Sequence, residues 1–384
     1  MEETGSLQTL DTPCLVLDID RVNRNIERLQ THLSSLGVSL RPHLKTAKSV
    51  DVARRVMNGT AGPATVSTLK EAELFAEAGV SDIIYAVGIA PGKFDRVFAL
   101  RATGVDLTLI LDSIEQAQLA AAASREAQEP LPVLIEVDCD GHRSGVAPGD
   151  SDLLVKIGRI LVDGGAELRG VLTHAGGSYS AVGRDALTQC AERERAAAVS
   201  AALALREAGL PCPVVSVGST PTAHFARDLT GVTEVRAGVF VFFDLVMAGI
   251  GVCAIEDIAL SVLTTVIGHQ SAKGWILVDA GWMAMSRDRG TAKQIVDQGY
   301  GVVCDVHGTP YPDLIVVEAN QEHGVIALRP GCSGEGKLPE LAIGTQLRIL
   351  PNHACSTGAQ HDRYHVVQGE SGDVVAVWPR FGGW

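Results

Sequence analysis

The 384-residue chain has few of the features that mark membrane, secreted or nucleic-acid-binding proteins. No apolar run approaches the roughly 20 residues that a membrane-spanning helix needs. The first residues are polar and acidic, and they lack the basic and then apolar segments of a secretory signal. The formal net charge of −13 disfavours nucleic acid as a partner, because like charges repel. These absences predict a cytoplasmic protein with no membrane or nucleic-acid partner.

Closely spaced cysteine pairs are also missing. None of the eight cysteines stands in a C-x-x-C motif. A chain of this length can bury its core without disulfides, so we interpret the cysteines as reduced thiols. The composition, with 46% hydrophobic residues and 41 glycines, is typical of a globular α/β protein. The length indicates two domains.

Short apolar runs alternate with helix-like stretches from about residue 38 to residue 244. Most of these runs are continuous rather than alternating, which is typical of parallel strands covered on both faces. The eight predicted strands are residues 38–45, 64–67, 82–87, 106–111, 132–138, 168–174, 213–217 and 234–239. Eight strand–helix units in this span predict a (β/α)8 barrel. An open, doubly wound sheet is the alternative, but no G-x-G-x-x-G turn follows the first strand.

The pattern changes after residue 244, where helical periodicity fades. Strand-like segments separated by glycine, proline and aspartate turns follow, at residues 260–267, 275–279, 314–318, 324–328, 346–350 and 374–378. We expect an all-β domain at residues 250–384 and the barrel at residues 20–249. The strand-like segment 14–19 precedes the barrel, so residues 1–19 are expected to join the β domain.

Polar residues that can carry chemistry follow several of the predicted barrel strands. Catalytic groups of such barrels sit at the carboxyl ends of the strands. The candidates at this end are Lys45, Arg143, His174, the turn Gly218-Ser219-Thr220, and Arg236. All of them are therefore expected at one mouth of the barrel.

Lys45 is either a surface lysine or a buried amine that forms an imine with an aldehyde cofactor. Its position at the end of a strand allows both interpretations. The turn Gly218-Ser219-Thr220 offers backbone N–H groups and hydroxyls to a phosphate, at the place where barrels often bind one. An ordinary turn that caps the next helix is the alternative for this segment.

A second candidate site lies in the predicted β domain. His353 and Cys355 are two residues apart, so they would share one face of a strand. Imidazole and thiolate suit Zn²⁺, and two protein ligands would leave positions open for water or substrate. A buried cysteine beside an unrelated histidine is the alternative. His361 and His365 are weaker candidates, because no regular spacing brings them to the same face.

Four segments together resemble the metal-activated, fold-type III pyridoxal-phosphate enzymes that act on D-amino acids. They are residues 41–46 (RPHLKT), 173–179 (THAGGSY), 216–222 (SVGSTPT) and 351–355 (PNHAC). D-serine dehydratases and D-threonine aldolases are in this group, and alanine racemases are more distant relatives that share the barrel. Longer runs at residues 233–244, 279–289 and 320–324 extend the resemblance over nearly the whole chain.

The resemblance implies roles for the candidate residues. Lys45 would hold pyridoxal 5'-phosphate as a Schiff base and take the Cα proton of the substrate. The other implied cofactor-binding residues are Gly218, Ser219, Thr220 and Tyr179 on the phosphate side and Arg143, His174 and Arg236 around the ring. One arginine would face the pyridine nitrogen. His353 and Cys355 would bind a divalent metal, Zn²⁺ or Mn²⁺. The candidate substrate residues are Arg41, His43 and Arg143 for a β-carboxylate, with Gln321 and His323 in addition.

The implied reaction is the dehydration and deamination of a β-hydroxy-D-amino acid. D-threo-3-hydroxyaspartate, giving oxaloacetate and ammonia, is the first candidate substrate, and D-serine, giving pyruvate, is the second. Cys355 favours dehydration, since the aldolases of the group carry an acidic residue there. D-threonine aldolase-type cleavage, racemisation and non-catalytic binding of the cofactor are the alternatives. Single-barrel carriers of the cofactor lack a second domain, which disfavours the last one. The resemblance also implies a homodimer.

Overall fold

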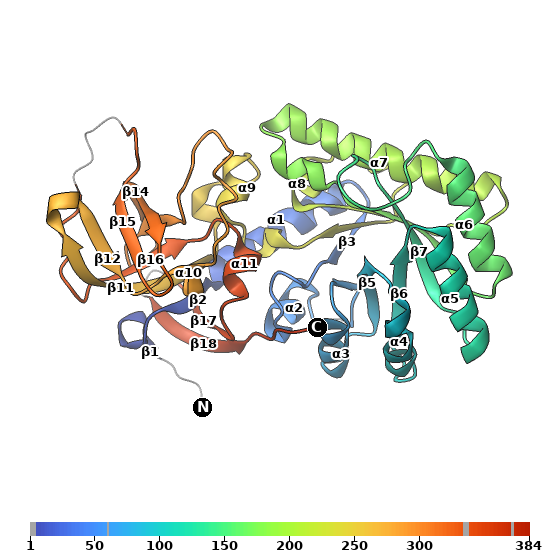
Figure 1. Cartoon of the computed structure of the whole chain (residues 1–384), viewed down its shortest axis with the longest axis horizontal. Coiled ribbons are helices and arrows are strands. Elements are labelled where there is room, and N and C mark those ends of the chain that lie inside the picture. The colour runs from blue at the N-terminus through green and yellow to red at the C-terminus, as the bar shows by residue number, and fades with distance from the viewer. Residues whose placement is uncertain (1–4, 60, 333–337, 370–371) are drawn as a thin grey trace. The chain divides into compact units, whose positions relative to one another are not determined.

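The computed structural model describes residues 5–59, 61–332, 338–369 and 372–384. The chain forms two compact units (Figure 1). The barrel unit comprises Arg28–Gly238 and the last two residues, and the β unit comprises the chain up to Glu27 together with Val239–Gly382. The division falls inside α1 (Ile19–Ser35). The domain boundaries at residues 20 and 250 stay a prediction.

The barrel unit confirms the predicted (β/α)8 architecture. Its strands are β3 (Ser39–Pro42), β4 (Ala64–Val66), β5 (Asp82–Gly88), β6 (Asp106–Leu111), β7 (Pro132–Val137), β8 (Glu167–Thr173), β9 (Val214–Val217) and β10 (Glu234–Ala237). They pair in parallel in the order β3-β10-β9-β8-β7-β6-β5-β4. A bridge between His43 and Thr65, with the Leu44 N–H 2.8 Å from the Thr65 carbonyl, links β3 to β4 and nearly closes the ring.

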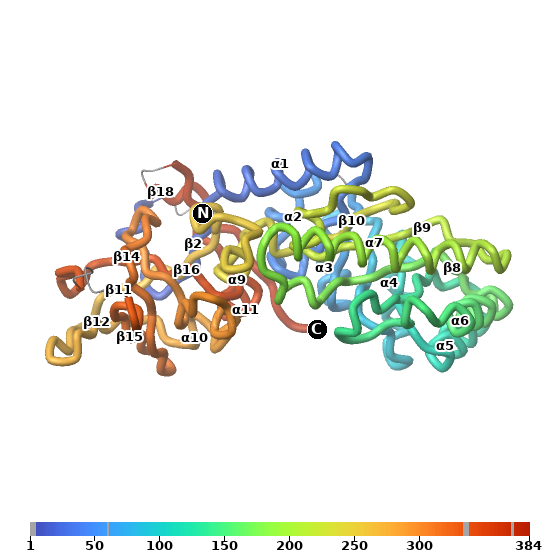
Figure 2. Tube along the Cα trace, turned by 90° about the horizontal axis from the view of Figure 1, so that it is seen from above, coloured from blue at the N-terminus to red at the C-terminus, as the bar shows by residue number. Residues whose placement is uncertain are grey.

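Helices cover the outside of this barrel (Figure 1). They are α2 (Val50–Val56), α3 (Leu69–Glu77), α4 (Phe94–Arg101), α5 (Ile114–Ala127), α6 (Ser151–Asp163), α7 (Arg184–Glu207) and α8 (Thr220–Phe225). The long α7 packs beside α6 and α8. The Cα trace shows α7 and α6 next to each other (Figure 2). Thr68, Ser113 and Asp150 begin α3, α5 and α6 by accepting a backbone N–H with the side chain. Such caps fix where each turn ends and its helix begins.

The core of the barrel combines an apolar cluster with buried polar side chains. Ile84, Ile110, Leu134 and Leu172 pack together in the apolar cluster, and burial of each side chain contributes about 1.5–3 kcal/mol to stability. The strands β9, β10 and β3 instead carry hydrogen-bonded polar side chains inside the barrel, namely Ser216, Glu234, Arg236 and Arg41.

The β unit is built on a ten-stranded sheet. Its strands are β1 (Gly5–Ser6), β2 (Cys14–Asp18), β11 (Leu260–Gln270), β12 (Trp275–Val278), β13 (Val302–Cys304), β14 (Pro310–Ala319), β15 (Gly324–Leu328), β16 (Gln346–Leu350), β17 (Arg363–Val367) and β18 (Asp373–Pro379). Because β11 pairs with both β12 and β16, the six strands β11-β12-β15-β14-β13-β16 close into a ring. The pairing of β2 with β11 confirms that the segment before the barrel adds a strand to this domain.

Short helices complete the two units. The α-helices of the β unit are α9 (Leu245–Gly249), α10 (Trp282–Met285) and α11 (Ala354–Gly358). The 3-10 helices are η1 (Leu7–Thr9), η2 (Pro91–Lys93), η3 (Gly176–Ser180), η4 (Val239–Val241), η5 (Ile255–Asp257) and η6 (Ser271–Lys273). Within the described part of the chain, no helix has the length and apolar character that crossing a membrane requires.

Candidate active site

The residues at the mouth of the barrel come together around Lys45. Lys45 lies in the turn that follows β3, and its side chain is exposed. Burial lowers the pKa of the neighbouring His43 well below its usual range, and the charges of Lys45 and Arg236 lower this pKa further. Because the charges of these side chains act on one another, Lys45, His43, His174 and Arg236 form one cluster. The structure thus groups residues from three strand ends, as expected.

His174 is held as a neutral imidazole. Burial lowers its pKa from 6.5 to about 3, the hydrogen bond to Gly218 opposes this shift, and the charges of Lys45, Arg236 and Arg143 add to it. The His174 Nδ1 lies 2.9 Å from the Gly218 carbonyl oxygen. A carbonyl can only accept, so Nδ1 carries the hydrogen and Nε2 keeps its lone pair. Tyr179, on η3, has its ring centroid 6.2 Å from that of His174.

The predicted phosphate turn joins β9 to α8. Ser219 caps α8, since its Oγ accepts the Thr222 N–H at 3.3 Å and its own N–H donates to Thr222 Oγ1 at 3.0 Å. The Gly218 N–H donates to a carboxylate oxygen of Glu194 at 3.0 Å. Two of the backbone donors that the sequence offered to a phosphate are therefore used within the protein. The Thr220 hydroxyl is buried and has no hydrogen-bond partner among the residues that the structure describes.

Gly218 is required at this turn. Its φ is +138°, and a Cβ there would lie 2.0 Å from the Arg236 carbonyl oxygen. The absent side chain lets β9 and β10 approach closely. This contact also fixes the backbone of Arg236 beside the turn.

The two arginines predicted to flank the cofactor ring differ in their surroundings. Arg236 is buried inside the barrel, where its guanidinium donates to Ser216 Oγ at 2.6 Å and to the Thr173 carbonyl. The Arg143 side chain is 60% exposed, and its guanidinium lies 3.6 Å from Glu136. Arg236 is thus a fixed interior cation, whereas Arg143 belongs to the rim.

Arg41 does not join this group. Its guanidinium contacts Asp82 and Glu234, both at 2.7 Å, and the Ala64 carbonyl. Asp82, Ala64 and Glu234 are the first residues of β5, β4 and β10, so they lie at the amino ends of the strands. The Arg41 side chain therefore points to the opposite end of the barrel and is neutralised there, which rules out its predicted contact with a substrate at the mouth.

The polar groups of the barrel fit a phosphorylated aldehyde cofactor. Among the described residues, the buried atoms without a hydrogen-bond partner include His43 Nδ1, Thr65 Oγ1 and Thr220 Oγ1. A buried polar atom without a partner costs about 1–3 kcal/mol, so such atoms commonly face a ligand or water. The mouth combines them with a lysine amine, a neutral imidazole and a buried guanidinium.

The second candidate site, in the β unit, has a different local structure from the one expected. His353 is the N-cap of α11 and Cys355 lies in its first turn, so the expectation that both lie in one strand is wrong. β16 ends at Leu350, because Pro351 cannot continue the ladder. The two side chains nevertheless share a hydrogen bond. The start of a short helix, and not the face of a strand, brings them together.

His353 is oriented by a carboxylate that the sequence analysis missed. Its Nδ1 lies 2.7 Å from Asp288 Oδ2 and 3.1 Å from Ser356 Oγ. Burial lowers the pKa of His353, but Asp288, Cys355 and Asp244 outweigh this effect and raise it to about 11. Asp288 lies in the run 279–289 that extended the family resemblance, and only this run pointed to it.

Buried side chains hold the segment that carries His353 and Cys355. Asn352 donates to the carbonyls of Asp288 and Gly299 and accepts from Thr291 Oγ1. The Asp244 carboxylate caps α9 and accepts the Ala354 N–H at 3.0 Å. Three distant segments of the chain therefore fix one short loop.

These residues fit a metal site with two protein ligands. In the described ranges, no group of three or more His, Cys, Asp and Glu side chains could hold a metal ion. With Nδ1 of His353 bound to Asp288, Nε2 and the Cys355 sulfur are the two atoms that would hold a metal ion. A carboxylate on the other ring nitrogen is common for a metal-bound histidine. His361, the weaker candidate, makes a different contact: its Nε2 lies 2.9 Å from the Ala284 carbonyl oxygen.

Gln321 and His323 lie in the turn between β14 and β15. Both side chains are exposed. The turn is fixed to α10, since the Met283 N–H donates to the Gln321 carbonyl at 3.2 Å. The structure therefore places both residues at the surface of the β unit, in the turn that follows β14.

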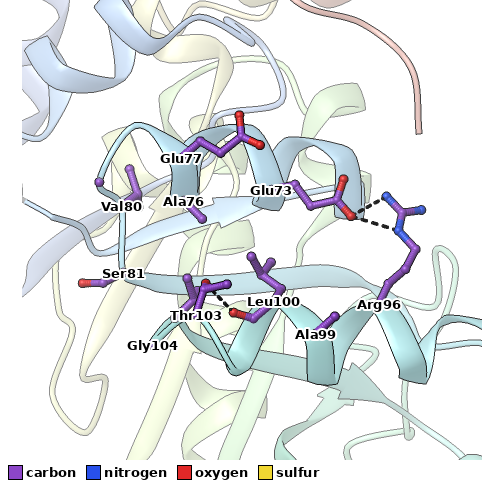
Figure 3. Close-up of a pocket in the computed structure, with 12 residues that line it drawn as sticks. Glu73, Ala76, Glu77, Val80, Ser81, Arg96, Ala99, Leu100, Thr103 and Gly104 are labelled. Atoms are coloured by element: carbon purple, nitrogen blue, oxygen red, sulfur yellow. Dashed lines mark hydrogen bonds and ion pairs between the residues drawn. The ribbon is translucent and has the colours of Figure 1, made fainter.

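The groove between α3 and α4, of about 580 Å³, is not a candidate site. Glu73 and Arg96 point toward each other across it and form an ion pair of 2.9 Å (Figure 3). The other lining residues are mostly small or aliphatic. The groove lacks the grouped chemistry of the barrel mouth.

Both parts of the chain match known protein families. Residues 17–246 match the family of the alanine racemase N-terminal domain. The chain belongs to this family. Residues 259–367 match the putative serine dehydratase domain, so both parts of this family member have known counterparts. The first match contains Lys45 and the phosphate turn, and the second contains His353 and Cys355.

Full-length relatives of this family member include dehydratases. A D-threo-3-hydroxyaspartate dehydratase of Delftia sp. is 57% identical over 384 residues, which is all of both chains. The structural match to a solved structure of this dehydratase has a TM-score of 0.95. It covers 99% of the present chain and 100% of the chain of the dehydratase. Another structure of a D-threo-3-hydroxyaspartate dehydratase is of a cysteine-to-alanine mutant in the metal-free form. A D-serine dehydratase of Dictyostelium discoideum is 29% identical, over 98% of each chain.

Proposed function

We propose that this chain is a pyridoxal-phosphate- and metal-dependent lyase that dehydrates a β-hydroxy-D-amino acid, with D-threo-3-hydroxyaspartate as the preferred substrate. The observation that carries the proposal is the 57% identity, over the full length, to a dehydratase of that substrate. The barrel mouth and the pair His353–Cys355 supply the two kinds of site that such a reaction needs.

The barrel residues would hold the cofactor. Lys45 would bind its aldehyde carbon, Thr220 and Tyr179 would hold the phosphate side, and Arg236 would face the pyridine nitrogen, as the buried arginine of the two. Pyridoxal phosphate, when bound, supplies an electron sink for the charge that develops at Cα. Lys45 would then remove the Cα proton with its amine, and the neutral His174 would not compete for it at neutral pH.

The β-unit residues would act at the β-hydroxyl. A divalent metal on His353 and Cys355 would act as a Lewis acid for the departing hydroxide. We propose Zn²⁺ because imidazole and thiolate are the softer ligands, with Mn²⁺ as the alternative. The product released from 3-hydroxyaspartate rearranges and loses ammonia in water to give oxaloacetate, and D-serine would give pyruvate in the same way. Of the groups considered for a β-carboxylate, we propose Arg143, whose side chain is 60% exposed.

One assay tests this function. The purified chain, loaded with pyridoxal phosphate, is incubated with each 3-hydroxyaspartate stereoisomer and with D-serine, with Zn²⁺, Mn²⁺ or a chelator. Release of oxaloacetate and ammonia from the D-threo isomer, lost with the chelator, supports the proposal. Release of glycine and glyoxylate would identify an aldolase instead, and activity that is independent of metal would refute the role of His353 and Cys355. The proposed homodimer is checked by the mass in solution.

A further inference from the structure

We infer that Glu194 is a positioning residue that sets the turn for the cofactor's phosphate. The inference rests on the proposed cofactor. Glu194 lies near the middle of α7 and is 2% exposed. Its Oε1 accepts the N–H of Ala175 at 2.9 Å and the N–H of Gly218 at 3.0 Å. One carboxylate oxygen therefore ties together the backbone segments that follow β8 and β9.

These two segments carry the groups assigned to the cofactor. Ala175 directly follows His174, and Gly218 directly precedes Ser219 and Thr220. The Gly218 carbonyl also accepts from His174 Nδ1, so Gly218 is fixed through both of its backbone polar groups. A shift of Gly218 would therefore move the turn and the imidazole together.

Glu194 also reaches the helix that begins at the turn. Its carboxylate is hydrogen-bonded to the side chain of Thr222, whose Oγ1 accepts the Ser219 N–H. The same side chain thus fixes the turn at both ends. The Ser219 hydroxyl is in addition 2.9 Å from Ser178 Oγ on η3, which carries Tyr179.

The surroundings of Glu194 show that packing alone does not explain it. Its buried neighbours on α7 are mostly alanines, such as Ala191, Ala197 and Ala198. Burial raises the pKa of Glu194, which measures the cost of placing a carboxylate there. An apolar residue would pack at this position without that cost. What offsets this cost is that the carboxylate binds two backbone N–H groups and the side chain of Thr222.

The test compares two probes, pyridoxal 5'-phosphate and pyridoxal, which lacks the phosphate. Each is titrated into the cofactor-free full chain, and the dissociation constants are measured by absorbance. We expect Glu194→Leu to weaken binding of pyridoxal phosphate by about 10- to 100-fold, and that of pyridoxal by less than about 3-fold. Glu194→Gln keeps a carbonyl oxygen for both N–H groups, so it should restore most of the preference for the phosphorylated probe.

A second variant and a control make the test decisive. Glu194→Asp shortens the side chain by one methylene and so withdraws the acceptor. It should also lower the ratio of the affinity for pyridoxal phosphate to that for pyridoxal. This variant tests the inference if Glu194→Leu does not fold. Glu129→Gln removes a carboxylate that binds Arg101, the last residue of α4, at 2.6 Å, and it should leave the ratio unchanged. Equal weakening of both probes in the Glu194 variants would overturn the inference. A wild-type chain that binds neither probe would remove the proposed function itself and this inference with it.

Discussion

His174 shows at the residue scale how burial sets a charge state. Its pKa is lowered from 6.5 to about 3, so the unfolded chain binds a proton that the folded chain excludes. This stabilises the fold above pH 6.5, and the contribution is lost as the pH falls from 6.5 toward 3. Between pH 7 and pH 5, the free energy of unfolding of the wild type should therefore fall. In His174→Asn, which has no imidazole to protonate, we expect this fall to be smaller by about 2 kcal/mol.

Urea unfolding of both proteins at the two pH values measures this difference. His269→Asn is a matched control, because it makes the same substitution at an exposed histidine of β11. An identical pH dependence in the wild type and His174→Asn would show that the buried imidazole takes up its proton at an ordinary pH.

Asp288 acts at the same scale, through one contact with His353. Asp288→Asn keeps the size of the side chain but replaces the acceptor that holds Nδ1. We expect the affinity for Zn²⁺ to fall by about 10- to 100-fold, because an outer-shell partner orients the ligand. Zn²⁺ titration against a competing chelator measures the affinity. Asp297→Asn, which removes the ion pair with Arg289 in the following loop, is the control and should keep the metal affinity.

At the scale of the elements, the connection between β9 and α8 has no room for a side chain at Gly218. A Cβ on Gly218 would collide with the Arg236 backbone, so Gly218→Ala must separate β9 from β10. We expect a loss of stability well above the roughly 1 kcal/mol of backbone strain alone, together with weaker cofactor binding. Thermal unfolding and a cofactor titration measure the two effects.

Gly209→Ala is the matched control for that element. Gly209 has a φ of +78° at the end of α7, and nothing lies within 4 Å of its would-be Cβ. It carries the strain of a left-handed backbone without the collision. If both alanine variants lost the same stability, close approach of β9 to β10 would not be the reason for Gly218.

At the scale of the whole molecule, the two sites belong to different compact units. Lys45 and its neighbours are in the barrel unit, and His353, Cys355 and Asp288 are in the β unit. We therefore expect the two sites to load independently. Lys45→Ala should lose the visible absorbance of the imine but keep metal binding, and Cys355→Ala should lose the metal but keep the absorbance. Dehydration should be lost in both.

Absorbance spectra and metal analysis of the two purified variants check this independence. Lys93→Ala, which removes a lysine that hydrogen-bonds Tyr85, is the control for Lys45 and should keep both ligands. An imine band that survives in Lys45→Ala would refute the central assignment. Loss of the band in Cys355→Ala would show that one site depends on the other.

The sequence by itself determined the eight-stranded barrel, the β domain that follows it and the strand that precedes it. A parallel strand that is covered on both faces needs a continuous apolar run, and the helix that follows it needs a helical pattern. Both patterns are local, so they can be seen in the sequence. β1, β13 and β17 were not predicted, and the two residues of β1 and the three of β13 are too few to show a periodicity. The candidate residues Lys45, Thr220, His353 and Cys355 were also visible, since unusual chemistry stands out in a short motif.

Only the tertiary structure decided which end of the barrel a side chain faces and which distant groups orient it. Arg41 and Lys45 are four residues apart, yet Arg41 points to the opposite end because Asp82 and Glu234 bind it there. The partners of His353 and Gly218, Asp288 and Glu194, are far away along the chain and follow no spacing rule. Such contacts depend on how strands and helices pack, so local patterns cannot contain them.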